Sequence, residues 1–109
     1  MTYAQGSVIL APATFKSGVR PYLVVSNRDR PFFGDRYTVA VITSTERETA
    51  VELTADSLTE GELKTYPSYV SQWSLHVFPH QEITKRVAQV DESTMTSIAD
   101  GIQELTRVL

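Results

Sequence analysis

Short apolar runs separated by turn residues occupy the chain up to Val90. The runs are rich in β-branched residues and are bounded by glycine, proline or asparagine, which is typical of β-strands. The expected strands are Ser7 to Ala11, Pro21 to Asn27, Tyr37 to Thr43, Ala50 to Thr54, Ser68 to Phe78 and Arg86 to Val90. The second and third are apolar at successive as well as alternate positions, which predicts burial on two faces. Thr59-Glu60-Gly61 is expected to be a turn.

The last part of the chain has a helical period instead. Its apolar residues recur every three or four positions, at Met95, Ile98, Ile102, Leu105 and Leu109. Asp91 is the expected N-cap, and Gly101 in the middle of the helix suggests that another segment packs closely there. Short antiparallel strands followed by one amphipathic helix predict a mainly β (α+β) fold, a small barrel-like domain with a helix against it.

Composition narrows the class of protein. The chain has 109 residues, 41% of them hydrophobic and 21% charged, so we expect one globular domain over residues 1–109. The absence of cysteine excludes a disulfide framework, a thiolate nucleophile and Cys-ligated zinc. No apolar stretch approaches the roughly 18 residues of a membrane helix, and no signal peptide is visible. We therefore expect a cytoplasmic protein with no membrane partner.

The distribution of charge is more informative than its sum. A net charge of −3 argues at first against nucleic-acid binding. However, residues 16–36 contain five basic and two acidic residues, whereas residues 46–62 contain six acidic residues and one arginine. Aromatic residues lie within this basic segment or directly beside it, namely Phe15, Tyr22, Phe32, Phe33 and Tyr37. It could form a groove that follows phosphates and stacks bases, or it could consist of solvated loop charges and core aromatics.

Metal and nucleotide motifs are missing from the sequence. His76 and His80 are separated by Pro79 and accompanied only by Glu82, so we predict no metal site and no cofactor. No P-loop, Gly-x-Gly-x-x-Gly or Gly-x-Ser-x-Gly motif occurs.

One arrangement of polar residues suggests chemistry on phosphate. Arg20 begins the second apolar run, and Thr43 and Ser44 end the third. If these runs pair as antiparallel strands, a guanidinium and a hydroxyl meet in one place. Arginine clamps phosphoryl oxygens bidentately and threonine adds a donor, so the pair suits a phosphoryl oxyanion.

Three stretches of the chain resemble the MazF/PemK toxin family, within the CcdB/MazF-like superfamily. They are Gly6-Ser7-Val8-Ile9-Leu10, Gly18-Val19-Arg20-Pro21-Tyr22-Leu23-Val24-Val25-Ser26-Asn27, and Val39-Ala40-Val41-Ile42-Thr43-Ser44. Ala50-Val51-Glu52-Leu53 and Ser68-Tyr69-Val70 fall where the family's next strands lie, and Asp91 with the final helix matches its ending. The resemblance covers nearly the whole chain, and the Arg-Pro strand and the Ile-Thr-Ser strand end are its specific parts.

The resemblance implies an SH3-like β-barrel that forms a homodimer and pairs with a cognate antitoxin, together with which it binds DNA. It also implies metal-independent endoribonuclease cleavage of single-stranded mRNA by attack of the 2′-OH, which leaves a 2′,3′-cyclic phosphate and a 5′-hydroxyl. The family's catalytic arginine and threonine fall on Arg20 and Thr43, with Ser44 beside them. The residues expected to bind RNA are Lys16, Arg28, Arg30, Arg36, Trp73 and His76.

The roles of these residues can be argued physically. Arg20 suits stabilisation of a pentavalent phosphorane, and Thr43 can donate to a phosphoryl oxygen or position the 2′-OH. His76 or Glu46 is the candidate general base. Some family members carry an arginine and an aspartate where this chain has Ser71 and Trp73. We therefore expect a different RNA specificity, and cleavage is expected to be weak if the missing pair is essential.

Two alternatives stay open at this point. The chain could be a toxin of the same fold that inhibits a protein target such as DNA gyrase, or a catalytically silent barrel that acts as a binding or regulatory module. Trp73 could likewise stack on a base or anchor the core.

Overall fold

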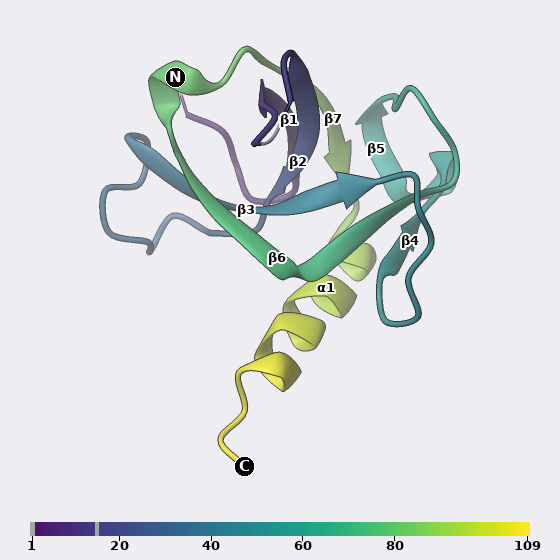
Figure 1. Cartoon of the computed structure of the whole chain (residues 1–109). Coiled ribbons are helices and arrows are strands. Elements are labelled where there is room, and N and C mark those ends of the chain that lie inside the picture. Colours follow the sequence, from purple (N-terminus) through teal and green to yellow (C-terminus); the bar gives the residue numbers. More distant parts are fainter. Residues whose placement is uncertain (1, 15) are drawn as a thin grey trace.

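The computed structural model describes residues 2–14 and 16–109. Antiparallel strands curve around a common interior, and one helix crosses below them toward the C-terminus (Figure 1). In chain order the elements are β1 (Ser7–Pro12), β2 (Val19–Val24), β3 (Arg36–Thr43), β4 (Val51–Leu53), η1 (Ala55–Ser57), β5 (Leu58–Gly61), β6 (Ser68–Pro79), η2 (His80–Glu82), β7 (Lys85–Val90) and α1 (Glu92–Leu105).

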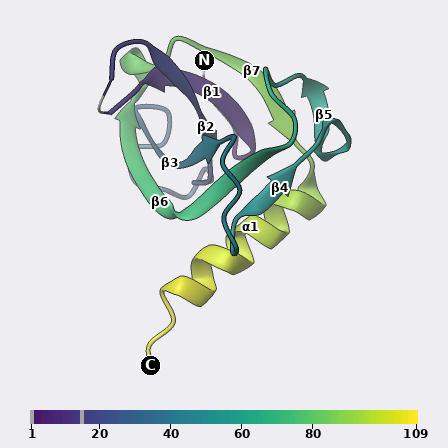
Figure 2. The same cartoon turned by 45° about the vertical axis from the view of Figure 1, so that its right-hand side comes forward.

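The seven strands form one sheet in the order β4-β6-β3-β2-β1-β7-β5. Every pairing is antiparallel, and the sheet curls into a nearly closed barrel (Figure 2). The predicted barrel with a C-terminal helix is confirmed. β1 lies between β2 and β7, so residues that are far apart in sequence are neighbours across β1.

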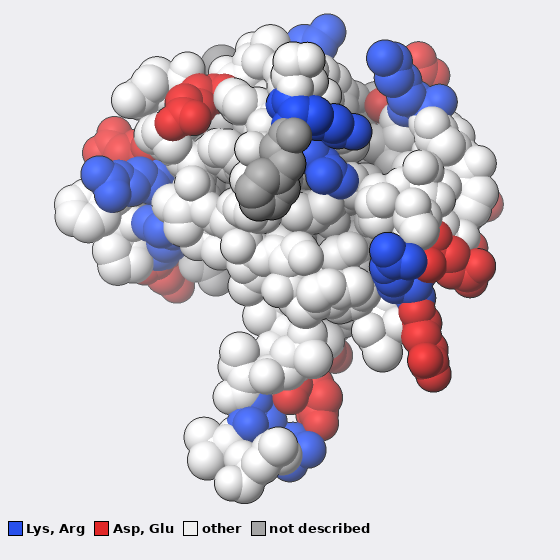
Figure 3. Space-filling view, in the orientation of Figure 1, with Lys and Arg blue, Asp and Glu red and all other residues white. Residues whose placement is uncertain are grey.

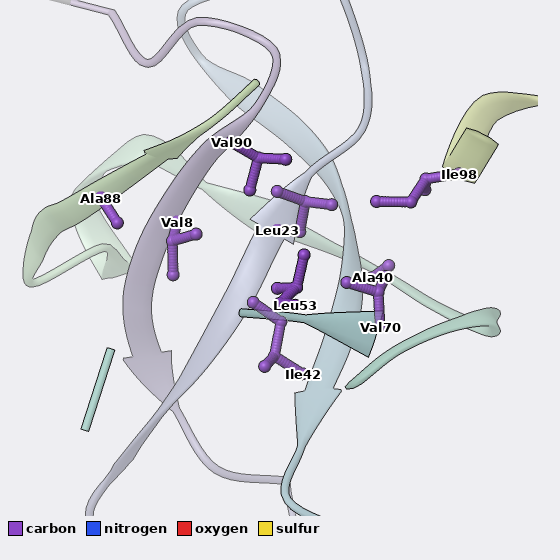
Figure 4. Close-up of a cluster of buried hydrophobic side chains, with 9 residues drawn as sticks. All are labelled: Val8, Leu23, Ala40, Ile42, Leu53, Val70, Ala88, Val90 and Ile98. Carbon is purple, nitrogen blue, oxygen red and sulfur yellow. The ribbon is translucent and has the colours of Figure 1, made fainter. Parts of the chain in front are cut away.

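Both faces of the central strands are buried. Leu23 belongs to one apolar cluster, whereas Tyr22 and Val24, on the other side of β2, belong to a second. The first cluster, shown in Figure 4, consists of Val8, Leu23, Ala40, Ile42, Leu53, Val70, Ala88, Val90 and Ile98. Full burial of each such aliphatic side chain stabilises the fold by about 1.5–3 kcal/mol. The expectation of strands buried on two faces is thus confirmed.

The helix α1 closes one side of the first cluster. Thr94 N donates to Asp91 Oδ1 at 2.8 Å, so Asp91 is the N-cap, as predicted. Ile98 is fully buried. A Cβ added to Gly101 would collide with the Gln72 side chain, which explains the glycine in the middle of the helix. Leu109 lies beyond the helix and is fully exposed, so its assignment to the apolar face is wrong.

A shallow groove of about 310 Å³ separates part of α1 from the sheet. We call it the helix groove. It is lined by Val25, Ser26, Thr38, Leu75, Met95, Ile98, Ala99 and Ile102.

Two expectations about the strands need correction. The predicted turn Thr59-Glu60-Gly61 lies in β5, an edge strand that pairs with β7. Backbone pairing forms β5 with only one apolar residue, so no alternating pattern marks it in the sequence. In addition, β2 starts at Val19 and ends at Val24, because the N–H groups of Val25 and Ser26 both donate to Thr38 O and the ladder stops.

No helix among the described residues is long and apolar enough to span a bilayer.

Candidate active site

The pairing of β2 with β3 makes Arg20 and Thr43 neighbours. In this ladder Tyr22 lies opposite Val41, and the same register continued by two residues places Arg20 opposite Thr43. Residues that are directly opposite point to the same side of a sheet, with Cβ atoms about 4.5–5.5 Å apart. Arg20 and Thr43 thus lie near each other just beyond the last pair of the β2–β3 ladder, as the sequence predicts.

Two contacts fix the Arg20 side chain. Its Nη2 donates to Ile42 O at 2.9 Å, and its Cζ lies 5.8 Å from the centroid of the Tyr22 ring. The Nε–H is buried and has no hydrogen-bond partner within the described residues. An unpaired buried donor costs about 1–3 kcal/mol, so an anion bound at this edge of the guanidinium would recover that free energy.

Thr43 ends β3 with its hydroxyl already oriented. Thr45 N donates to Thr43 Oγ1 at 3.2 Å, so the oxygen is used as an acceptor and the hydroxyl hydrogen can be donated to a ligand. Ser44 follows directly and is exposed. Both hydroxyls thus lie at the rim of the sheet beside Arg20.

Arg20, Thr43 and Ser44 line one pocket of about 790 Å³, which we call the cationic pocket. Five cationic side chains and one acidic side chain, Glu62, line it. Figure 3 shows basic side chains gathered near the upper ends of β1 and β2. The full lining is Leu10, Lys16, Val19, Arg20, Pro21, Ile42, Thr43, Ser44, Glu62, Leu63, Lys64, Thr65, Ser68, Lys85, Arg86 and Val87.

Three of the cations, Lys64, Lys85 and Arg86, were not predicted from the sequence. Lys85 reaches the pocket because Leu10 of β1 pairs with Pro21 on one side and with Lys85 on the other. Arg86 Nη1 and Nη2 donate to Glu60 Oε2 at 3.1 and 3.2 Å, and Nη2 also donates to a glutamine of β7. The register of β7 against β1 reveals Lys85 and Arg86, whereas Lys64 reaches the pocket from the loop before β6.

The basic residues of segment 16–36 do not form one groove. Lys16 and Arg20 line the cationic pocket, whereas Arg28, Arg30 and Arg36 do not. β3 runs from Arg36 to Thr43, and these two ends of the strand lie roughly 23 Å apart. Arg30 is held elsewhere, since its Nε donates to Thr38 Oγ1 at 2.9 Å. Arg36 is near Arg20 in the sequence, but it lies at the opposite end of β3 from Thr43 and the pocket.

Trp73 and His76 lie on β6 outside the cationic pocket. Trp73 is 44% exposed, so the alternative of a core anchor is wrong. The His76 ring lies 6.1 Å from the Tyr22 ring, on which the Arg20 guanidinium also rests. Tyr22 therefore contacts both side chains, and only Arg20 lines the pocket.

The aromatic residues in and beside segment 16–36 have different environments. Tyr22 and Tyr37 are fully buried, so they are core residues and not stacking platforms. Phe32 is exposed and lies beneath the Arg36 guanidinium, with 5.8 Å from Cζ to the ring centroid. Phe15 lies outside the described residues.

No three histidine or carboxylate side chains of residues 2–14 and 16–109 converge in a way that could hold a metal. His80 Nδ1 instead forms a hydrogen bond of 2.9 Å with Tyr37 Oη.

Glu46 follows Thr43 by three residues and lies near Tyr69. Tyr69 pairs with Thr43 in the β3–β6 ladder and with Glu52 in the β4–β6 ladder. Burial raises the pKa of Tyr69, and the nearby carboxylates of Glu46 and Glu52 raise that pKa further. Arginine, threonine, tyrosine and carboxylate thus follow one another across four adjacent strands.

Comparison with solved structures shows the same fold at low sequence identity. An endoribonuclease in complex with its cognate antitoxin from Mycobacterial species shares 18% identity with a TM-score of 0.74, covering 94% of this chain and 91% of that chain. The Mycobacterium tuberculosis toxin MazF-mt6 shares 24% identity with a TM-score of 0.70, covering 90% and 93%. A MazE–MazF complex (Form-II) from Deinococcus radiodurans shares 14% identity with a TM-score of 0.74, covering 100% and 99%.

No curated protein matches the chain. The sequence model of a family described as PemK-like, MazF-like toxin of type II toxin-antitoxin system matches residues 4–106. This match extends from the segment before β1 to the residue after α1, so it includes every element that lines the cationic pocket. The chain therefore belongs to the PemK-like, MazF-like toxin family of type II toxin–antitoxin systems.

Proposed function

We propose that this chain is the toxin of a toxin–antitoxin pair and acts as an endoribonuclease on single-stranded RNA. The observation that carries the proposal is that Arg20 and Thr43, which lie just beyond the β2–β3 ladder, line the same pocket, whose wall includes five cations. Membership of the toxin family and the name of the Mycobacterial endoribonuclease support the same activity. RNA is the polymer whose own 2′-OH supplies the nucleophile, so the chain needs no nucleophilic side chain.

The proposed reaction is an internal transesterification. The ribose O2′ attacks the adjacent phosphorus, the bond from phosphorus to O5′ breaks, and a 2′,3′-cyclic phosphate and a 5′-hydroxyl result. The 2′-OH proton passes to a base, and O5′ takes up a proton. Negative charge grows on the non-bridging oxygens of the phosphorane, where the Arg20 N–H groups and the Thr43 hydroxyl can donate.

Neither of the two candidate bases, Glu46 and His76, lines the cationic pocket, and Glu46 lies nearer to the end of β3 than His76 does. His76 lies outside the cationic pocket and packs on Tyr22. Glu46 lies near Tyr69, the residue paired with Thr43. We propose Glu46 as the base that accepts the 2′-OH proton, because it follows Thr43 by three residues and lies near Tyr69.

We further propose that the chain pairs with a cognate antitoxin, binds DNA together with it, and forms a homodimer. The solved complexes of an endoribonuclease with its cognate antitoxin and of MazE with MazF support the first of these.

The test is incubation with a long single-stranded RNA in EDTA. We expect the wild-type chain to cut it and to leave 5′-hydroxyl ends. Arg20→Ala should slow cleavage by about 10²–10³-fold, the usual effect of removing one donor to a developing oxyanion. Arg107→Ala is the matched control, because it removes the same charge from the end of the chain beyond α1.

Two outcomes would contradict the proposal. RNA that stays intact with micromolar wild-type protein would exclude the endoribonuclease. Inhibition of gyrase supercoiling that survives Arg20→Ala would instead assign the chain to toxins that act on a protein target.

A further inference from the structure

The chain contains only three lysines, Lys16, Lys64 and Lys85, and all three line the cationic pocket. They come from three separate segments: the β1–β2 loop, the loop before β6 and the first residue of β7. Only one of the thirteen acidic residues, Glu62, lines the same pocket. An acidic protein thus collects every lysine at one place, where the like charges repel one another unless an anion is bound.

Two of these lysines have no part in the proposed cleavage step. Lys64 and Lys85 are exposed, and neither forms an ion pair within the described residues. Arg86, the neighbour of Lys85, is different because Glu60 already pairs with its guanidinium. Lys64 and Lys85 are therefore the free cations on the wall formed by β7 and the loop before β6.

Arg20 and Lys85 belong to strands that lie on opposite sides of β1. Pro21, which follows Arg20, pairs with Leu10, and Leu10 pairs with Lys85. Two strand spacings separate Pro21 from Lys85, roughly 10 Å. A single phosphodiester bound by Arg20 and Thr43 carries one negative charge, whereas the three lysines add three further positive charges to the pocket. A chain of linked phosphates, in contrast, would reach both walls of the pocket.

We propose that Lys64 and Lys85 form a subsite for the phosphates that flank the scissile phosphate of a polynucleotide. This inference rests on the proposed endoribonuclease function and adds to it. Contacts to phosphate position a nucleic acid but do not read its sequence. The subsite therefore sets how long a substrate must be and how strongly it binds, and it leaves the choice of base to other residues.

The experiment uses oligoribonucleotides built around a cleavage site mapped in the long RNA. Substrates with one, two and four internal phosphates are compared for the wild type, Lys64→Ala, Lys85→Ala, the double variant and Lys85→Arg. Both lysines are exposed, so the variants should fold. Arg107→Ala is the matched control, because it removes an exposed positive charge outside the pocket.

We expect each alanine variant to raise KM by about 5–10-fold on the longest substrate while kcat stays within about twofold. Each lost lysine should reduce the slope of log affinity against log salt by about 0.7, the value for single strands. Lys85→Arg should keep the wild-type KM. In the wild type KM should fall as phosphates are added, and in the double variant this dependence should be lost.

An unchanged KM and salt slope in the double variant, or an equal effect of Arg107→Ala, would overturn the inference. Failure of the proposed function gives a different result, since the wild-type protein itself would then cut no RNA. In that case, binding of a 2′-O-methyl twelve-nucleotide RNA, followed by fluorescence anisotropy, tests the lysines separately. Weaker binding by the double variant would support the subsite, and equal binding would overturn it.

Discussion

The cationic pocket and the helix groove differ in the side chains that line them. Five cations line the pocket, whereas no charged residue among those described lines the groove. The pocket lies where strands end and loops begin, and the groove lies where α1 rests on the middle of the sheet. The polar side chains at the strand ends are available to a ligand, while the apolar side chains beneath the helix stabilise the fold. Substitutions in the two regions should therefore have separable effects.

The largest effect on stability is expected from Ile98→Ala beneath the helix. Ile98 is fully buried in the first apolar cluster, so truncation should lower the free energy of unfolding by about 2–5 kcal/mol. Urea denaturation measures this loss. The rate of RNA cleavage per folded molecule should not change, and a slower rate in the fully folded variant would show that the two regions are coupled.

Thr43→Val should have the opposite pattern. Valine keeps the shape and the preference for strands but removes the hydroxyl, so kcat should fall by about 10²-fold. The free energy of unfolding should stay within about 0.5 kcal/mol of the wild type. Thr38→Val is the matched control, because Thr38 lies on the same strand but lines the helix groove. Equal losses of activity in the two variants would argue against a special role for Thr43.

Gly101→Ala tests the contact between α1 and β6. Alanine favours the helix, but its Cβ meets the buried Gln72 side chain, so we expect a net loss of roughly 1–2 kcal/mol. The double variant Gly101→Ala/Gln72→Ala should recover stability beyond the sum of the single effects in a double-mutant cycle. Additive effects would mean that the two residues do not interact.

Asp91→Asn should have the smallest effect, and only in acid. Hydrogen bonds from Thr94, and then Ser93, hold the pKa of Asp91 below its usual value. Its ionised form therefore stabilises the fold above the unfolded pKa, and this contribution is lost as pH falls through the lower folded pKa. Asparagine caps equally well and does not titrate. Urea midpoints should match near neutral pH and fall less steeply below about pH 4 for Asp91→Asn; identical acid profiles would contradict the assignment.

Local patterns in the sequence predicted the central strands and the helix, but not the edge strand β5. Val24 and Val39 lie in runs that are apolar on both faces, and such runs are recognisable without knowing their partners. β5 has one apolar residue, Leu58, and exists because its backbone pairs with β7. A strand that depends on its partner leaves little signal in its own sequence.

The same distinction separates the two halves of the candidate site. Arg20 and Thr43 lie on consecutive strands, so their proximity follows from antiparallel pairing alone. Lys85 reaches the pocket only because β1 lies between β2 and β7, a long-range arrangement that no local pattern encodes. Arg36 shows the converse. It belongs to the same basic segment of the sequence as Arg20, but it lies at the far end of β3 from the pocket.

The placement of the lysines determines how the chain responds to amine-directed chemistry. Its primary amines are the α-amino group and the three lysines, and all three lysines line the cationic pocket. Apart from the α-amino group, an amine-reactive dye, a crosslinker or an activated surface would therefore react only within the pocket. A label intended to leave the pocket free needs another attachment point, such as a cysteine introduced in the exposed segment after α1.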